Sequence, residues 1–109
     1  NDFDGIIAVA DEMLAVNPQD ALAQKIRLQA LFDKKDYAGV IASAEEAAAG
    51  HTDEEERSDV YFILGAAYNA RTMPQQAIDA LSKVTAGANV AAAQKTVAQL
   101  KENAAKANS

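Results

Sequence analysis

The chain has 109 residues, of which half are hydrophobic and only 6% are aromatic, and its formal net charge is −6. This length suits one small domain, and the acidic balance argues against nucleic acid and anionic membrane surfaces as partners, because both select basic patches. The chain contains no cysteine and therefore no disulfide, and its compartment stays open, either cytoplasmic or exported after removal of a signal peptide.

The first two helices are predicted from apolar spacing and end signals. One runs over about residues 4–16, with its apolar side chains on a single face. Asn17 and Pro18 are typical of a helix start, a cap residue followed by proline at the first helical position. The second helix is therefore expected to begin there and to run to about Asp33.

Cap residues also bound the third and fourth helices. Asp36 caps the third, which is expected to end at Gly50, a residue typical of a left-handed helix terminator. Thr52 and Glu55 have the spacing of a capping box at the start of the fourth. Residues 53–56 are all acidic. This run suits the positive end of the helix dipole better than a cation site, because adjacent helical side chains point in different directions.

The last two helices follow the same rules. Pro74 opens the fifth, and Gly87 is expected to end it. Asn89 caps the sixth, which covers about residues 90–106. The longest charge-free apolar stretch, near residues 60–70, is too short to span a bilayer. No membrane-spanning helix is therefore expected.

One set of residue types recurs at a nearly constant interval and marks an internal repeat. The first segment carries Phe3, Ile6, Ile7, Ala10 and Met13, the same frame returns 34 residues later as Tyr37, Val40, Ile41, Ala44 and Ala47, and it returns after 37 more as Pro74, Ala77, Ile78, Leu81 and Val84. A repeat of this length with helical spacing inside each unit predicts stacked helix pairs, each of which needs neighbours to bury its apolar face.

Residues 58–91 show the repeat most clearly, through two aromatic residues, a leucine, a glycine and a small residue of the next helix: Tyr61, Leu64, Gly65, Tyr68 and Ala77. This pattern resembles the tetratricopeptide repeat (TPR) family, whose unit is a helix–turn–helix, with Tyr61 in place of the usual tryptophan. The resemblance implies an all-α fold, a right-handed superhelix of about six antiparallel helices. Because they are small, Gly65 and Ala77 are expected to face each other where two helices cross.

The rest of the chain follows the repeat frame less closely. Residues 1–18 match the second helix of a partial repeat, and residues 21–54 match a complete repeat in which Leu28 replaces the glycine and widens the crossing. Residues 90–107 keep one narrow apolar stripe, as a terminal capping helix requires. The whole chain is thus expected to be a single TPR-like domain.

Catalytic and metal-binding chemistry finds little support in the sequence. His51 is the only histidine and is expected to be an exposed loop residue, whereas a metal ligand would want a second histidine or a cysteine. The serines lie in no nucleophile motif, and the five glycines are too scattered for a phosphate-binding loop. The chain is therefore not expected to be an enzyme, and no catalytic residue, cofactor or metal ion is predicted.

The TPR resemblance does imply a binding surface. In that family the first helix of each unit lines a concave groove, which in this chain selects the following peptide- or protein-binding residues: Lys25, Gln29, Phe32, Asp59, Phe62 and Asn69. Lys25 and Gln29 resemble part of the carboxylate clamp of some family members, but Asp59 brings the wrong sign of charge. The expected function is a non-catalytic scaffold for a peptide or partner protein. The alternative is a structural C-terminal segment of a longer helical-repeat protein, without a ligand site of its own.

The first helix lacks the hairpin partner that the repeat frame assigns to it. Ile6, Ala10 and Met13 are therefore expected on an uncovered side. Contiguous exposed apolar surface usually marks a contact site. Homodimerisation through this helix, or cover by upstream residues of a parent protein, is the resulting expectation.

Overall fold

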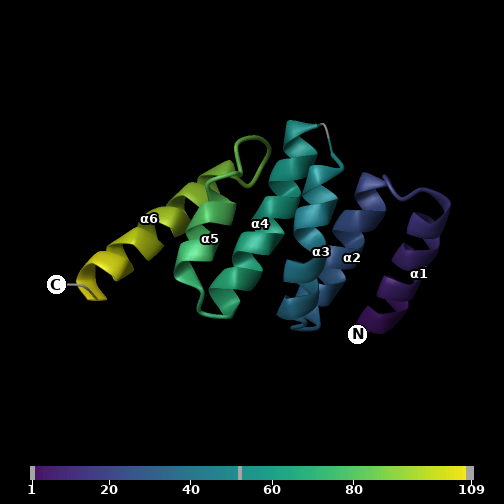
Figure 1. Cartoon of the computed structure of the whole chain (residues 1–109), viewed down its shortest axis with the longest axis horizontal. Coiled ribbons are helices and arrows are strands. Elements are labelled where there is room, and N and C mark those ends of the chain that lie inside the picture. The colour runs from purple at the N-terminus through teal and green to yellow at the C-terminus, as the bar shows by residue number, and fades with distance from the viewer. Residues whose placement is uncertain (1, 52, 108–109) are drawn as a thin grey trace.

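The computed structural model describes residues 2–51 and 53–107, and these residues form six α-helices and no strand. The helices are α1 (Phe3–Val16), α2 (Ala21–Asp33), α3 (Tyr37–Ala49), α4 (Glu54–Ala70), α5 (Pro74–Leu81) and α6 (Val90–Ala107). Figure 1 shows them side by side in chain order, from α1 at one end to α6 at the other. The molecule is elongated, with extents of 51 × 28 × 20 Å. The prediction of an all-α fold is confirmed.

Aspartate caps begin the first three helices. In each case a carboxylate accepts a hydrogen bond from the backbone N–H three residues later, at Asp2, Asp20 and Asp36. The predicted cap at Asp36 is confirmed, but the predicted start of the second helix at Asn17 and Pro18 is wrong. The Asn17 carboxamide oxygen instead accepts from Gln19 N–H at 3.1 Å and closes a short turn after α1.

Two further predicted boundaries are displaced, and a third, the end of α3 at Gly50, holds in position but not in conformation. Gly50 follows α3 but has φ −81°, so it is not a left-handed terminator. Gly87 is left-handed, with φ +91°, yet α5 has already ended at Leu81 and the glycine lies in the following loop. The fourth helix is capped by Asp53, which accepts from Glu55 N–H at 3.4 Å. The proposed capping residue Thr52 lies outside the described residues.

The predicted starts of the last two helices, α5 and α6, are confirmed. Pro74 occupies the first turn of α5, where its missing N–H is not needed. Helix α6 begins at Val90 as predicted, and the backbone carbonyl of Asn89 accepts the first helical hydrogen bond from Ala93 N–H at 2.9 Å. The Asn89 side chain is turned toward α4 instead.

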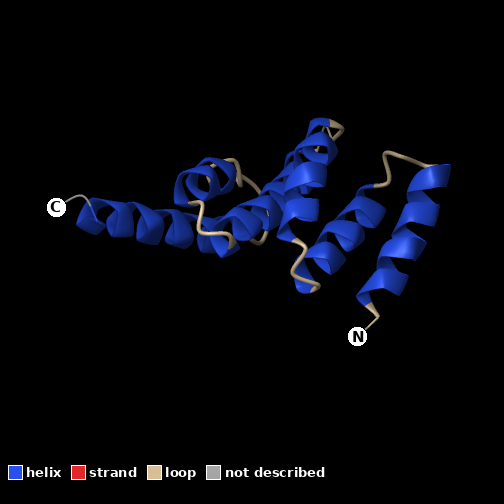
Figure 2. Cartoon of the chain, turned by 60° about the horizontal axis from the view of Figure 1, so that its bottom comes forward, coloured by secondary structure: helices blue, strands red, loops and turns tan. Residues whose placement is uncertain are grey.

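The main core lies where α2, α3 and α4 meet. Its fully buried residues are Leu28, Leu31, Val40, Ala44, Ala47, Ala48, Val60, Leu64, Ala67 and Ala80. Half of these ten are alanines, which let helix backbones approach closely. A second, smaller cluster of Leu81, Val84 and Ala93 joins α5 to α6. Figure 2 shows how α6 extends away from the remaining helices.

The α4–α5 hairpin closes around a glycine. Gly65 is buried, and a Cβ atom added to it would lie 2.5 Å from Leu81 Cδ2 and 3.5 Å from the Ala77 carbonyl oxygen. The expected close approach of Gly65 to α5 near Ala77 is confirmed, and the side chain that fills the crossing is Leu81. At the equivalent position of α2 stands the buried Leu28, and there the contact between α2 and α3 is less extensive.

Both hairpins turn through the same device. Lys35 and Thr72, which are 37 residues apart, have φ values of 70° and 59°. In each turn the next N–H reaches back to a helix carbonyl, Asp36 to Leu31 at 2.8 Å and Met73 to Tyr68 at 2.9 Å. This is the Schellman arrangement, in which glycine is usual at the left-handed position.

Helix α1 is attached to the α2–α3 hairpin by apolar and ionic contacts. Ala10 is fully buried, so the prediction of an uncovered Ala10 is wrong, because α2, the helix that packs against α1, covers this small side chain. Arg27 Nε donates to Asp11 at 2.7 Å, and Lys34 Nζ donates to Asp4 at 2.7 Å. The hydrogen bond to Asp4, followed by its negative charge, raises the pKa of Lys34.

Enlarging Gly65 should destabilise the domain. Leucine at this position would overlap Leu81, and overpacking of this kind costs about 1–3 kcal/mol or more. We expect the denaturation midpoint of Gly65→Leu to fall well below that of Ala105→Leu, a matched change on the exposed part of α6. Equal midpoints for the two variants would show that this helix crossing is misplaced.

Replacing Thr72 by glycine should stabilise the domain. A β-branched residue in the left-handed region is strained by about 1–2 kcal/mol, and the greater chain entropy of glycine offsets part of that gain. The expected net increase in unfolding free energy is about 0.5–1 kcal/mol, measured by urea titration. The control is Arg71→Gly, because Arg71 has φ −89° and its replacement should destabilise. A loss of stability in both variants would contradict the strain at Thr72.

Candidate functional site

The predicted binding residues lie on two helices that are neighbours in space. Lys25, Gln29 and Phe32 belong to α2, whereas Asp59, Phe62 and Asn69 belong to α4. These helices contact each other directly although α3 separates them in the sequence. The structure therefore brings the two predicted rows together, and we call the surface that they share the α2–α4 face.

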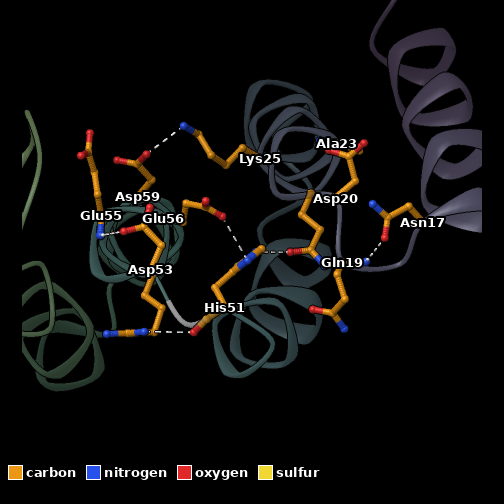
Figure 3. Close-up of polar contacts among 12 residues, drawn as sticks. Asn17, Gln19, Asp20, Ala23, Lys25, His51, Asp53, Glu55, Glu56 and Asp59 are labelled. Atoms are coloured by element: carbon orange, nitrogen blue, oxygen red, sulfur yellow. Dashed lines mark hydrogen bonds and ion pairs between the residues drawn. The ribbon is translucent and has the colours of Figure 1, made fainter.

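An ion pair bridges the α2–α4 face. Lys25 Nζ lies 2.8 Å from Asp59 Oδ2, and the two side chains are 39% and 19% exposed (Figure 3). Asn89 Nδ2 also donates to Asp59, at 3.5 Å, and so links the start of α6 to the pair. Asp59 was expected to bring the wrong sign of charge for a carboxylate clamp. In the structure Asp59 pairs directly with Lys25 and neutralises it, so this lysine is engaged within the chain.

The two phenylalanines of the face divide their surface between core and solvent. Phe32 packs edge-on against Tyr37, with ring centroids 5.3 Å apart, and against the main core. Phe62 packs against the second cluster, beside α5 and α6. Both are partly buried, so each supports the fold and offers only part of its ring to a partner.

The remaining residues of the face are more accessible. Gln29 and Asn69 are exposed, and Gln29 Nε2 donates to Asp33 at 3.0 Å. Leu22 lies one helical turn before Lys25 and is 60% exposed. A leucine this open contributes little to the core and leaves most of its apolar side chain in water.

The structure corrects the expectation for His51. Its side chain is buried, with only 8% of the residue exposed, between α2 and the start of α4 (Figure 3). Gln24 donates through Nε2 to the Pro18 carbonyl at 2.7 Å, which turns its amide oxygen toward His51 Nε2. Glu56 Oε2 lies 3.3 Å from His51 Nδ1. The imidazole is therefore a buried connector between two helices.

The sequence near His51 gave only a weak indication that this histidine connects two helices. Arg57 donates to the His51 carbonyl at 3.0 Å, and Glu56 contacts the ring, so two residues of the next helix hold the loop. Charged residues only five and six positions downstream were within reach of a short loop. The decisive partner, Gln24, is 27 residues away and could not be assigned from spacing.

The acidic run at the start of α4 does not converge on one point. Glu56 contacts His51, Glu54 accepts a hydrogen bond from Thr85 Oγ1 at 2.6 Å, and Asp53 caps the helix. Within residues 2–51 and 53–107, no group of three or more histidine, cysteine, aspartate or glutamate side chains is placed to hold a metal ion. In the same described part of the chain, no helix has the length and apolar character needed to cross a bilayer.

Comparison with known protein families finds no family model that matches this chain. Comparison with curated proteins likewise finds no significant match.

Removing His51 should weaken the link between α2 and α4. We expect His51→Ala to lower the unfolding free energy by about 1–3 kcal/mol, because the polar groups that it contacts lose a buried partner. A double-mutant cycle with Gln24→Ala should give a coupling of about 0.5 kcal/mol or more. Gln94→Ala, on the exposed side of α6, is the control and should change little. If His51→Ala unfolds at the same urea concentration as the control, the histidine does not join the helices.

Proposed function

We propose that the chain is a non-catalytic, TPR-like scaffold that forms a right-handed superhelix and binds a peptide or partner protein on the α2–α4 face. The support for this proposal is a repeat frame in which α2–α3 and α4–α5 turn through the same left-handed device at Lys35 and Thr72. Rigid repeats of this kind present side chains from successive first helices to a common ligand.

One observation carries the choice of face. Leu22 is left 60% exposed beside the Lys25–Asp59 pair, and the partly exposed ring of Phe62 follows on α4. Apolar anchors next to satisfied polar groups suit an extended or helical peptide with hydrophobic side chains. The neutralised Lys25 leaves no free lysine there for a carboxylate clamp, so affinity would come mainly from the apolar contacts.

A peptide selection tests this proposal without a known partner. Peptides are selected from a random displayed library against the immobilised chain, and the tightest is synthesised and titrated into variants. Phe62→Ala and Leu22→Ser should each weaken binding by roughly tenfold or more, since buried anchors dominate binding energy. Lys95→Ala, an exposed lysine of α6, should leave the affinity unchanged.

Circular dichroism of each variant separates binding from folding. Leu22→Ser must fold, because its side chain is largely in water, even if Phe62→Ala does not. Wild-type affinity in a folded Leu22→Ser variant would contradict binding on this face. Failure to select any peptide would favour the alternative, a structural segment of a longer helical array.

A further inference from the structure

Helices α1 and α3 are equivalent copies within the chain. Residues 2–16 align with residues 36–50 at an interval of 34, with the same aspartate and glycine at the start. The capping bonds are also the same, Asp2 with Gly5 at 2.9 Å and Asp36 with Gly39 at 3.0 Å. The helices that pack around α3 therefore indicate which kind of helix could pack against α1.

The two copies differ in how they are covered. Val40 of α3 is 0% exposed, but its counterpart Ile6 of α1 is 43% exposed. The reason is that α3 lies between α2 and α4, whereas α1 packs principally against α2 (Figure 1). Helix α2 covers one side of α3. The equivalent side of α1 has no such helix against it and faces solvent.

This uncovered side is a defined apolar hollow. It has a volume of about 510 Å³ and is lined by Ile6, Val9, Met13 and Ile26, together with Asp2 and small residues of α1. We call it the open face. Val9 is 56% exposed, and Ile26 is also exposed, so the hollow presents apolar groups from both α1 and α2. It differs from the α2–α4 face because α1 supplies most of it.

The other end of the molecule, formed by α6, presents a different kind of surface. Helix α6 turns charged and small side chains outward, including Lys95, Lys101 and Glu102. A polar outer surface of this kind is what ends a helical stack in water. A further helix would therefore meet exposed apolar side chains on α1 and mainly charged and small ones on the outer side of α6.

The charge of α1 indicates which helix would fit. The segment Phe3–Val16 contains Asp4, Asp11 and Glu12 and no lysine or arginine. Its one packed neighbour supplies the cations, since Arg27 and Lys34 pair with Asp11 and Asp4. A second copy of α1 would bring like charges together, whereas a basic helix would complement Asp2 and Glu12, which are exposed.

We propose that the open face binds a basic amphipathic α-helix of another polypeptide, in the position that α2 takes on α3. The apolar side of that helix covers Ile6, Val9 and Ile26, and its flanking lysines or arginines lie near Asp2 and Glu12. Helix-in-groove recognition of this type uses apolar anchors spaced by three or four residues.

The chain itself supplies a probe for this proposal. A synthetic peptide of residues 18–36 contains α2, the helix that covers α3, and carries four basic and three acidic side chains. Labelled peptide is titrated with the full chain and followed by fluorescence anisotropy. We expect saturable binding with a gain of peptide helicity by circular dichroism. Absence of saturable binding at any concentration up to the solubility limit overturns the proposal.

Matched variants locate the peptide. Val9→Asp should weaken binding by roughly tenfold or more, because it places a charge in the hollow. Ala91→Asp adds the same charge on an exposed part of α6 and should change nothing. Glu12→Lys should weaken binding less, with an effect that fades as salt is added. Equal affinities for Val9→Asp and Ala91→Asp overturn the proposal.

Two further measurements separate the alternatives. Leu22→Ser, a variant of the α2–α4 face whose side chain does not line the hollow, should leave peptide binding intact, so that failure of the α2–α4 face and failure of the open face give different results. Sedimentation of the chain alone should show a monomer. A dimer that Val9→Asp converts to monomer would assign the open face to a second copy and overturn the choice of occupant.

Discussion

The packing of α3 against α4 is the contact on which the rest of the structure depends. Val40, Ala44 and Ala47 of one helix meet Val60 and Leu64 of the other within the main core. Alanine removes little apolar area from water, so an alanine-rich helix gains its stability from close neighbours on both sides. Helices on one side of this pair (α1, α2) and on the other (α5, α6) extend a core that neither could form alone.

Polar connections then fix how the helices lie against one another. His51 joins Gln24 of α2 to Glu56 of α4, and the Lys25–Asp59 pair joins the same two helices on the α2–α4 face. Ionic contacts between exposed side chains contribute little energy. The buried histidine is the stronger constraint, because its ring nitrogens are shielded from water and depend on Gln24 and Glu56 for polar contacts. These connections hold α2 and α4, and with them Leu22 and Phe62, in a fixed relation.

The sequence predicted the helices because their caps and apolar faces follow from local spacing. The 34–37-residue interval, the cap at Asp36 and the small Gly65 at a crossing all depend on residues close to one another in the chain or on a periodic pattern. The errors arose where a choice between neighbouring signals was needed. Asp20 caps α2 instead of Asn17, and Gly87 lies beyond the end of α5 rather than at it.

Tertiary contacts decided the features that local patterns could not. His51 is adjacent to a glycine in a short loop and was expected in solvent, but Gln24, far away in sequence, encloses it. Ala10 was expected on the uncovered side of α1 together with Ile6, and both residues line the same hollow, yet the small side chain of Ala10 is fully buried whereas Ile6, one turn earlier, is 43% exposed. The residues predicted for a binding surface lie on two helices that contact each other, but the pairing of Lys25 with Asp59 required the distance between α2 and α4.

Amide hydrogen exchange of the isolated chain tests most directly the claim that each helix depends on its neighbours. Opening energies follow local packing. We expect slow exchange in α3 and α4 and clearly faster exchange in α1, although α1 and α3 have matching sequences and caps. Equal protection of the equivalent amides of α1 and α3 would contradict it, because an uncovered face on α1 would then carry no energetic consequence.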